Sequence, residues 1–292
     1  MIDNLTRAQI LIEALPYMQH FTGKTVVIKY GGNAMTDPAL VDGLLQDIAL
    51  LRCIGIRAVV VHGGGPEISK MLSQLDIPSN FHNGLRITDA DTMRVVQMSL
   101  AGKMNKDIVA RLTCLGAPAI GLCGKDAGLL QCVKVVSPDG VDLGYVGEVV
   151  KVNSDLIDNL CNAGYTPVIA PVGVGENGES YNINADTAAG AVAGALRAEK
   201  LIYLTDIDGV RTDPADPATL LPQLSVGEVG GLIANGTISG GMIPKVQSCV
   251  DAALRGVRRV HIISGTTPHA ILLEMLTKTG VGTMVYTESG EH

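Results

Sequence analysis

Aromatic residues are scarce in this chain: its 292 residues include no tryptophan, two phenylalanines and seven tyrosines. This scarcity argues against an aromatic-rich β-sandwich and favours an aliphatic core, as in proteins with buried parallel strands. Charged residues are also few, at 17%, against 47% hydrophobic residues. Such a composition excludes a disordered chain and a coiled coil.

The chain also lacks an excess of positive charge, since its formal net charge is −7. Nucleic acid is therefore not expected as a partner, because binding phosphates requires clustered Lys and Arg. No apolar run reaches the length of a membrane span, and the apolar stretch 10–15 is interrupted by Glu13 and lacks a basic start. The sequence predicts neither a membrane partner nor a signal peptide.

The cysteines form no CxxC pair and lack the spacing of zinc ligands. Six reduced thiols are typical of a cytoplasmic protein, and the cytoplasm is the location that we expect. No metal site made by the protein is predicted. The six residues are Cys53, Cys114, Cys123, Cys132, Cys161 and Cys249.

Short β-branched runs alternate with segments of helical periodicity along most of the chain. This alternation predicts an α/β protein with an open, mainly parallel central sheet and helices on both faces. The stretch 130–150 breaks the alternation, and its turn residues predict a β-hairpin excursion. The predicted strands lie at 25–28, 58–61, 118–122, 166–169, 201–204, 260–263 and 282–285.

We expect an N-terminal helix at 1–23, one lobe at 24–175 and a second lobe at 176–292, divided at a Gly-rich stretch. Thr6 and Gln9 have the spacing of a capping box for the helix. Pro16 should kink or split it. Such a helix either docks on another subunit or packs against its own chain.

Two glycine patterns resemble nucleotide-binding motifs without the required context. The segment GKT at 23–25 ends like a P-loop, yet a strand follows where a helix is needed. Gly173, Gly175 and Gly178 match the dinucleotide spacing, but no helix start follows them. We predict nucleotide binding at neither pattern.

Two further glycine clusters each follow a predicted strand and precede a predicted helix. Lys29 ends the first strand before Gly31 and Gly32, and the second strand runs into the triple glycine 63–65. Amides without neighbouring side chains can bind an anion at a helix N-terminus. Because ligands bind at the carboxyl ends of strands in open α/β sheets, both clusters should face one crevice.

Six segments together resemble the amino-acid kinase family, and within it the acetylglutamate kinases. They are KYGGNAM, VVVHGGGPEI, NGLRITD, YNINADTAA, YLTDIDGV and GGMIPK, in this order. NINAD together with GLRIT separates this group from the carbamate, aspartate and uridylate kinases. The resemblance implies phosphoryl transfer from ATP to the side-chain carboxylate of N-acetyl-L-glutamate, the second step of arginine biosynthesis. The lobe at 24–175 would then bind acetylglutamate, and the lobe at 176–292 would bind ATP.

That reaction joins two anions, so cations must line its path. Lys29 and Lys245 are the candidates to neutralise the transferring phosphoryl group. Asp186 either caps the helix that follows it or, as the resemblance implies, holds both lysines in place. Arg86 has the planar fork that suits the other carboxylate of the substrate. The resemblance places Gly64, Gly65, Arg86 and Asn182 on acetylglutamate, with Asn184 as a further amide beside them.

On the nucleotide side, Gly31 and Gly32 are expected at the phosphates. Thr205, Asp206 and Gly209, at the end of the strand LIYLTD, are expected to bind the rest of ATP. The same segment is also typical of a simple turn. Mg²⁺ is expected on the phosphates, with few or no ligands from the protein.

The resemblance further implies a hexamer, a trimer of dimers joined by N-terminal helices, in which arginine binds between that helix and the C-terminal segment. The matching residues are Tyr17, Lys200, Glu274 and Gly282. Ser264, Gly265 and Thr266 replace an Asp-Gly-Arg sequence that is usual in the arginine-inhibited group. Inhibition by arginine should therefore be weakened or lost.

Three other functions share parts of this pattern. A related kinase would act on carbamate, glutamate, aspartate or a nucleoside monophosphate. A catalytically inactive amino-acid sensor would keep only the fold, but intact Lys29, Asp186 and Lys245 argue against it. A nicotinamide-dependent oxidoreductase rests on the glycine pattern 173–178 alone.

Overall fold

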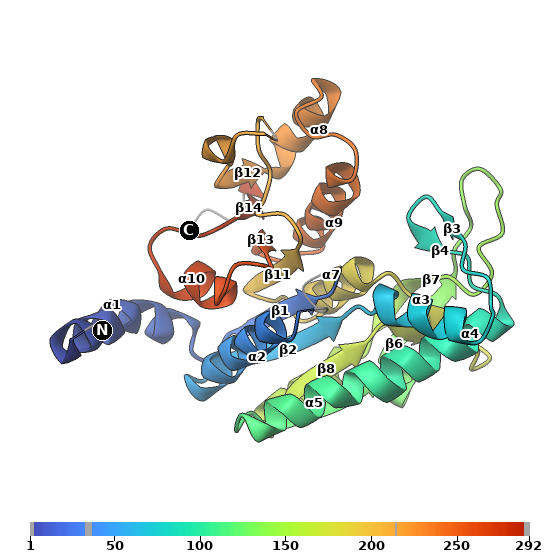
Figure 1. Ribbon diagram of the computed structural model, residues 1–292, viewed down its shortest axis with the longest axis horizontal. Helices are drawn as coiled ribbons and strands as arrows, with labels where there is room; N and C mark the ends of the chain where they lie inside the picture. The colour runs from blue at the N-terminus through green and yellow to red at the C-terminus, as the bar shows by residue number, and fades with distance from the viewer. Residues whose placement is uncertain (1–2, 33–36, 214, 289–292) are drawn as a thin grey trace.

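The computed structural model describes residues 3–32, 37–213 and 215–288. Its centre is an eight-stranded sheet in the order β12-β14-β13-β11-β1-β2-β8-β5 (Figure 1). Neighbouring strands are parallel except β13 and β14, so the predicted α/β class is confirmed. The strands are β1 (Thr25–Tyr30), β2 (Arg57–His62), β5 (Ala119–Cys123), β8 (Thr166–Ala170), β11 (Lys200–Thr205), β12 (Gln223–Ser225), β13 (Arg259–Ser264) and β14 (Thr283–Tyr286).

Helices cover both faces of this sheet, because its central strands are apolar on both sides. Val26 and Ile28 of β1 pack with one set of helices, whereas Val27 packs with the other. The first set is α2 (Pro38–Cys53), α5 (Asn105–Cys114) and α10 (Ala270–Leu276). The second set is α6 (Ser154–Asn162), α7 (Ala185–Ala195), α8 (Val226–Ala234) and α9 (Met242–Leu254).

A third cluster of apolar side chains lies under α3 (Gly65–Gln74) and α4 (Ala90–Gln97). A π-helix, η2 (Met98–Met104), follows α4 directly and continues directly into α5. Two single 3₁₀ turns, η3 (Asp126–Gly128) and η4 (Pro217–Thr219), complete the helical segments of the described chain.

The excursion predicted at 130–150 is a hairpin in a second sheet, of order β10-β9-β6-β7. Its strands are β6 (Leu130–Lys134), β7 (Gly147–Val152), β9 (Val172–Val174) and β10 (Ser180–Asn182). The stretch with the dinucleotide spacing is the turn between β9 and β10, and a strand follows it. The expected lobe boundary at 175/176 therefore falls inside a hairpin. A separate two-stranded sheet consists of β3 (Phe81–His82) and β4 (Leu85–Arg86), which are antiparallel.

The N-terminal helix α1 (Asn4–Phe21) differs from its prediction in two respects. Its N-cap is Asp3, whose carboxylate accepts from the backbone N–H groups of Leu5 and Thr6, so the capping box at Thr6 is wrong. Pro16 lies inside one uninterrupted helix and does not split it. A proline inside a helix removes one backbone hydrogen bond and crowds the carbonyl four residues earlier, yet α1 continues past Pro16 to Phe21.

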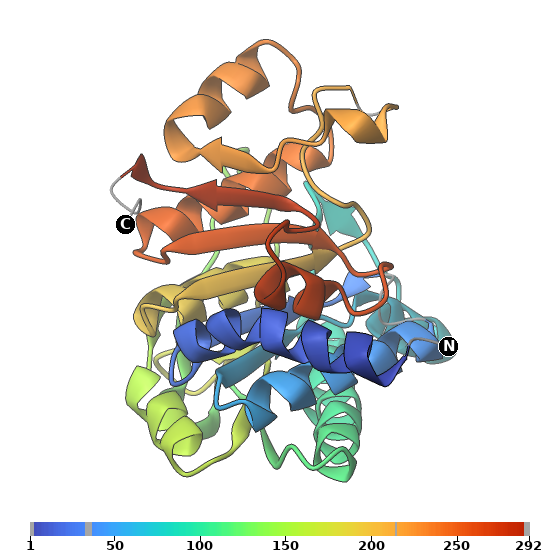
Figure 2. The ribbon, with the colours of Figure 1, turned by 90° about the vertical axis from the view of Figure 1, so that its left-hand side faces the viewer.

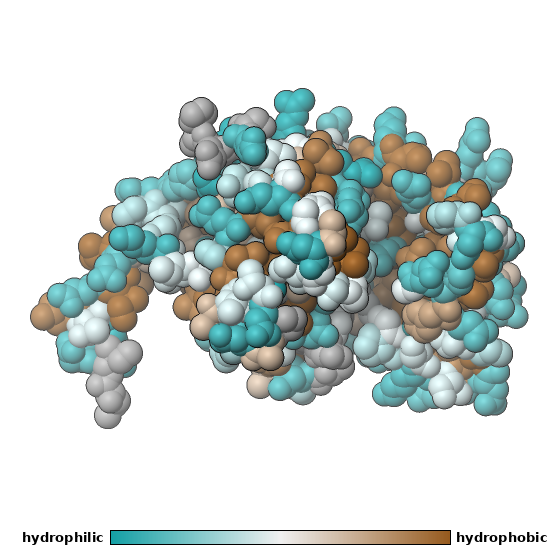
Figure 3. All heavy atoms as spheres, turned by 90° about the horizontal axis from the view of Figure 1, so that it is seen from above, coloured by the Kyte–Doolittle hydropathy of each residue, from teal (hydrophilic) through white to brown (hydrophobic). Residues whose placement is uncertain are grey.

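Helix α1 projects from the body of the molecule, and only its last turns lie near α10 (Figures 1 and 2). Apolar side chains are visible along the projecting part (Figure 3). Each of them is more than two-fifths exposed. They are Leu5, Ile10, Leu11, Ile12 and Leu15. Within the described ranges, no helix is both long and apolar enough to cross a membrane.

Candidate active site

The two glycine clusters meet at the carboxyl ends of β1 and β2, as the sequence predicts. The N–H of Gly63 donates to the carbonyl of Tyr30 at 2.7 Å and so joins the two loops. A Cβ on Gly31 would lie 3.2 Å from Nζ of Lys29 and 3.4 Å from Cα of Gly63. The absence of side chains therefore lets the lysine and both loops lie together. The calls on Asn33, Ala34 and Met35 in KYGGNAM lie outside the described residues.

Helix α3 begins at the triple glycine, with Gly64 as its N-cap and no side chain capping it. The first amides of this helix are thus available to an anion. Gly64 is also closely packed, because a Cβ there would lie 2.4 Å from Leu100 Cδ2 and 2.5 Å from Met104 Sδ. A residue with a side chain at this position would force the side chains of Leu100 and Met104 to move.

These loops form one wall of a cavity of about 270 Å³, which we name the glycine-loop pocket. The other walls come from the β3–β4 pair, the end of β10 and the start of α7. The predicted site residues that line it are Lys29, Gly32, Gly64, Gly65, Arg86, Asn182, Asn184 and Asp186. The structure therefore brings the predicted acceptor-binding residues together, and Gly32 lies with them.

Lys29 is held by Asp186, with 2.8 Å between Nζ and Oδ1. The alternative role of Asp186 as a helix cap is wrong, because Asn184 caps α7 through its Oδ1. The Asp186 carboxylate is therefore free to orient the lysine. Tyr203 is buried in β11, and its hydroxyl donates to the backbone carbonyl of Asp186 at 3.1 Å. This hydrogen bond holds the backbone of Asp186 in place.

Arg86 is only 6% exposed, although it carries a charge. Its guanidinium donates to the hydroxyls of Ser79 and Ser69 and to the carbonyl of Gly65, and it stacks on the ring of Phe81. Burial lowers the pKa of Arg86, but arginine remains protonated in proteins. All of these partners are neutral, and among the described residues no carboxylate pairs with Arg86. A buried, unpaired guanidinium is prepared for an anionic ligand.

Asn182 lies in β10, and its amide donates to the hydroxyl of Thr88 at 3.1 Å. This bond fixes the side chain at the rim of the glycine-loop pocket. Asn184 keeps its amide nitrogen for a ligand, since its oxygen caps α7. The sequence reasoning did not single out Ser69, Ser79, Phe81 or Thr88, which contact Arg86 or Asn182; Phe81 also lines the pocket.

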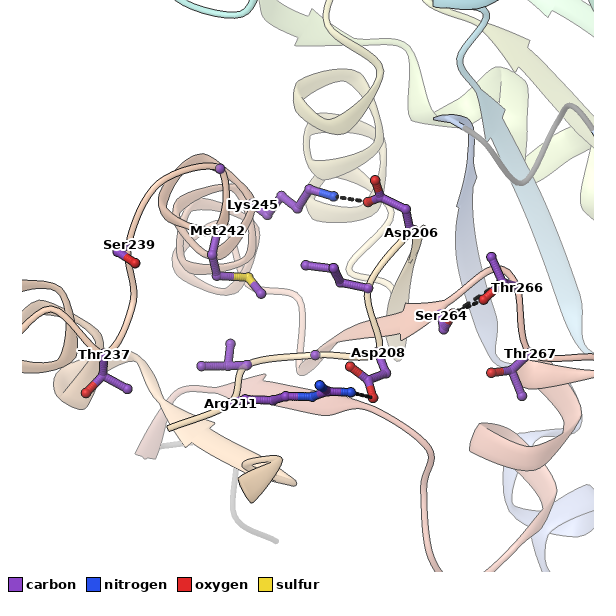
Figure 4. A pocket seen from close by; sticks show the side chains of 14 residues that line it. Asp206, Asp208, Arg211, Thr237, Ser239, Met242, Lys245, Ser264, Thr266 and Thr267 are labelled. Carbon is purple, nitrogen blue, oxygen red and sulfur yellow. Dashed lines mark hydrogen bonds and ion pairs between the residues drawn. The ribbon is translucent and has the colours of Figure 1, made fainter. Parts of the chain in front are cut away.

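A larger cavity of about 840 Å³, here the carboxy-terminal cleft, opens beside the ends of β11 and β13 (Figure 4). Asp206, Gly209 and Lys245 line it as predicted. Thr205 does not line it; its hydroxyl exchanges hydrogen bonds with the backbone of Ile207 and shapes the loop. Gly209 has φ +149°, and a Cβ there would lie 2.4 Å from Thr283 Oγ1, so this turn requires glycine.

The partner of Lys245 differs from the prediction. Its Nζ lies 2.8 Å from Oδ1 of Asp206, and Asp186 pairs with Lys29 alone (Figure 4). The hydrogen bond from Lys245, with a further contribution from the charge of Lys29, lowers the pKa of Asp206. Lys29 lies near the end of β1 and Asp206 directly follows β11, the neighbouring parallel strand, so the pocket and the cleft lie at the same edge of the sheet.

The sequence reasoning missed most of the other residues that line the cleft. Arg211 reaches Asp208 at 2.6 Å, and Ser264 bonds to Thr266 at 2.8 Å. Ser264 ends β13, so the rule that ligands bind at strand ends could have found it. The remaining polar residues come from loops without a recognisable pattern. They are Thr237, Ser239 and Thr267.

The four residues predicted to bind arginine all line a third cavity, of about 820 Å³, below the last turns of α1. Glu274 is buried there; its Oε1 lies 2.8 Å from Nδ1 of His261 and 3.9 Å from Nζ of Lys200. Burial lowers the pKa of Lys200 to about 8. Tyr17 and Gly282 complete the set. His261 was missed, because a lone histidine inside a strand gives no signal in the sequence.

Metal ligands are not clustered in the part of the chain that the structure describes: no group of three or more His, Cys, Asp or Glu side chains is placed to hold an ion. The carboxylates of the cleft, Asp206 and Asp208, are paired with Lys245 and Arg211. They suit hydrogen bonds to the water ligands of a Mg²⁺ ion that is itself bound to phosphates, since Mg²⁺ usually retains several waters.

Known proteins match this arrangement over nearly its whole length. A model of the amino acid kinase family matches residues 24–264. An acetylglutamate kinase of Heliobacterium modesticaldum is 53% identical, covering 98% of this chain and 99% of that protein. One from Moorella thermoacetica is 54% identical, covering 97% and 98%. The chain belongs to the acetylglutamate kinases of the amino acid kinase family. It is therefore an enzyme, a kinase.

Solved structures extend the likeness beyond the acetylglutamate kinases. An N-acetylglutamate synthase from Neisseria gonorrhoeae, complexed with coenzyme A and N-acetyl-glutamate, is similar with a TM-score of 0.85 and 29% identity. The match covers 96% of this chain and 63% of that longer chain. A carbamate kinase from Giardia lamblia shares the fold, with a TM-score of 0.66, 18% identity and coverage of 91% and 99%.

Proposed function

We propose that this kinase transfers the terminal phosphoryl group of ATP to the side-chain carboxylate of N-acetyl-L-glutamate, the second step of arginine biosynthesis. The buried guanidinium of Arg86 carries the proposal, because it faces the glycine-loop pocket with neutral partners only. The α-carboxylate of an acylated amino acid supplies the missing anion. The names of the relatives from Heliobacterium and Moorella support the same substrate.

In this reaction a carboxylate oxygen of the substrate attacks the terminal phosphorus, and ADP leaves. The attacking group has an ordinary pKa of about 4.3, so it is already ionised and needs no general base. Lys29 acts on the transferring group from the pocket, and Lys245 acts from the cleft, which offsets the charge that develops in the transition state. Asp186 orients Lys29. Mg²⁺ bound to ATP supplies further positive charge at the phosphates.

The remaining residues divide the two substrates between the two cavities. In our proposal, the lobe at 24–175 holds acetylglutamate and the lobe at 176–292 holds ATP. Asn182 and Asn184 lie beyond 175 but face the acetamido group from the second lobe. Gly31 and Gly32 approach the phosphates, and the loop from Thr205 to Gly209 contacts the nucleotide.

Coupled formation of ADP with N-acetylglutamate, compared with free glutamate, tests the assignment. We expect N-acetylglutamate to be strongly preferred, because a free ammonium group would place a charge where Asn182 and Asn184 offer only neutral amides. Carbamate, aspartate and nucleoside monophosphates serve as further acceptors in the same assay. Equal rates with glutamate, or a faster rate with another acceptor, would overturn the proposal.

We further propose that the protein is a hexamer, a trimer of dimers, that arginine inhibits at the cavity below α1. The exposed apolar face of α1 supports association through this helix. Buried Glu274 supports binding of a guanidinium. The N-acetylglutamate synthase of Neisseria gonorrhoeae also has a structure with L-arginine, at 27% identity to this chain.

Deleting residues 1–22 tests this regulation. The truncated protein should be a dimer by light scattering, should keep its activity and should no longer respond to arginine. A full-length protein that is dimeric, or that is indifferent to millimolar arginine, would contradict the regulatory proposal and leave the kinase assignment intact. Ser264, Gly265 and Thr266 make a weak response the expected form of inhibition.

A further inference from the structure

The π-helix η2 is followed directly by a fully buried polar residue. Asn105, the first residue of α5, is 0% exposed and reaches under the ends of β2, β5 and β8. Gly121 of β5 makes room for it, since a Cβ there would lie 1.9 Å from Oδ1 of Asn105. π-turns are rare and often occur near functional sites.

The contacts of Asn105 determine the orientation of its amide. Its Oδ1 accepts from Nζ of Lys106 at 3.1 Å, and its Nδ2 donates to the carbonyl of Val168 at 2.9 Å. The same Nδ2 lies 3.3 Å from Nε2 of His62 and 3.4 Å from the carbonyl of Leu122. Because the amide nitrogen is a donor, Nε2 must be the acceptor. The ring proton therefore lies on Nδ1, which donates to the carbonyl of Gly63 at 2.9 Å.

His62 is thus held as a neutral imidazole with both nitrogens occupied. It is 0% exposed and does not line the glycine-loop pocket. Burial lowers its pKa to about 4, so it stays neutral in the range where enzymes are assayed. A group with these properties cannot exchange protons with a substrate.

The triple glycine is therefore held at several points. The N–H of Gly63 donates to Tyr30, and its carbonyl accepts from His62. The next residue, Gly64, packs against Leu100 and Met104 of the same π-helix that delivers Asn105. Glycine is the most flexible residue, so three in succession need external contacts to keep their amides in one direction.

We propose that His62 and Asn105 are positioning residues of the glycine-loop pocket. They fix the carbonyl of Gly63 and thereby direct the amides of Gly64 and Gly65 into the glycine-loop pocket, where the acceptor binds. Neither side chain touches a substrate. The proposal rests on the phosphoryl transfer proposed above and assigns to this pair the alignment of the loop.

Two substitutions of His62 separate its two hydrogen bonds. In His62→Asn, the amide can occupy the place of Nδ1 and donate to Gly63. In His62→Gln, the longer amide reaches toward Asn105 instead. We expect His62→Gln to lower kcat by about 100-fold, the effect of a misplacement near 1 Å, with an unchanged KM for ATP. His62→Asn should keep kcat within about threefold of the wild type, because it keeps the bond to Gly63.

Asn105→Ala removes the amide that donates to Nε2 of His62. It should lower kcat by about tenfold, since the imidazole ring of His62 then loses its fixed orientation. Two controls separate this effect from instability. Ser99→Ala alters a buried hydroxyl of η2 that contacts Met71 instead of the glycine loop. Leu112→Ala empties a buried site on α5, two turns from Asn105. Both controls should keep kcat, and Leu112→Ala should do so despite a lowered Tm.

Nitrogen-15 chemical shifts of the His62 ring provide a readout that needs no substrate. The full-length wild type should show a proton on Nδ1 only, from pH 6 to 9, and Asn105→Ala should relax this preference. The pH profile of kcat should have the same shape in wild type and His62→Asn. A proton on Nε2, a charged ring, or equal kcat for His62→Gln and His62→Asn would overturn the inference. A wild type inactive on N-acetylglutamate would overturn the proposed function instead, and the ring spectrum would still test the contacts.

Discussion

The glycine-loop pocket and the carboxy-terminal cleft lie at the same edge of one sheet, yet their charges are held in different ways. Arg86 in the pocket is 6% exposed, and the side chain of Lys29 is 12% exposed. In the cleft, the side chains of Lys245 and Asp206 are 29% and 52% exposed and pair with each other. In the pocket, Arg86 has no carboxylate partner among the described residues, although Lys29 pairs with Asp186. In the cleft, Lys245 must exchange its partner Asp206 for contacts to the nucleotide.

This difference has an electrostatic consequence. A charge acts more strongly where water is excluded, because the effective dielectric constant is lower. Fixed charges also require no reorganisation during the reaction. The pocket should therefore determine the acceptor and much of the rate, and the more open cleft should tolerate change. Substitutions of matched pairs, one in each cavity, test this comparison.

The largest effect is expected from the two lysines. Lys29→Met should lower kcat by about 1,000-fold, and Lys245→Met by about 100-fold, because the more buried charge acts with less screening. Single-turnover measurements with saturating substrates give both values. A greater loss for Lys245→Met would show that burial does not rank the two charges.

The next largest effect concerns the two arginines. Arg86→Lys keeps the charge but loses the planar fork, so the KM for N-acetylglutamate should rise by about 10- to 100-fold with the KM for ATP unchanged. Arg211→Lys, its counterpart in the cleft, should leave the KM for N-acetylglutamate unchanged. Steady-state kinetics with each substrate varied in turn measures both. A defect of Arg86→Lys confined to ATP would contradict the division between the cavities.

The two carboxylates should differ in the same direction. Asp186→Asn weakens the hold on Lys29 and should lower kcat by about tenfold or more, without changing the shape of its pH profile. Asp206→Asn should change kcat by no more than a few fold. If a limb of the pH profile disappears in Asp186→Asn, the carboxylate is a base and our mechanism is wrong.

The smallest effect is expected for stability at the exposed pair of the cleft. Asp206→Asn should change the free energy of unfolding by less than about 1 kcal/mol, as for other exposed ion pairs. Because the pKa of Asp206 is lowered in the folded protein, its stabilisation is present above the unfolded pKa and is lost as the pH falls through the folded one. Urea titrations at pH 7 and pH 3 should show a larger difference between wild type and variant at pH 7 than at pH 3. A larger difference at pH 3 would contradict the sign.

Local patterns were sufficient to predict the fold class and the position of the ligand edge. Each predicted strand of the central sheet is present, because a β-branched run between glycine-rich turns has few other conformations available. The glycines beside Lys29 and before α3 lie where the loops approach one another. Those residues act through the backbone within a few positions of themselves, so their spacing along the chain carries the information.

Partners distant in sequence were decided only by the folded chain. Asp186 and Asp206 follow different strands, and nothing in their local sequence indicates which one pairs with Lys29 and which with Lys245. Asp3 caps α1 in place of Thr6, and Asn184 caps α7 in place of Asp186. In each case two suitable side chains lie near the same place.

The contact between His62 and Asn105 shows the same limit over 43 residues of chain. It depends on the π-helix η2, on the missing side chain of Gly121 and on the depth of burial, none of which has a signature in the sequence. The amino-acid pattern determines which groups can donate or accept a hydrogen bond. Tertiary packing determines which of them meet, because a short-range interaction of a few ångströms is satisfied only after the sheet has brought its strand ends together.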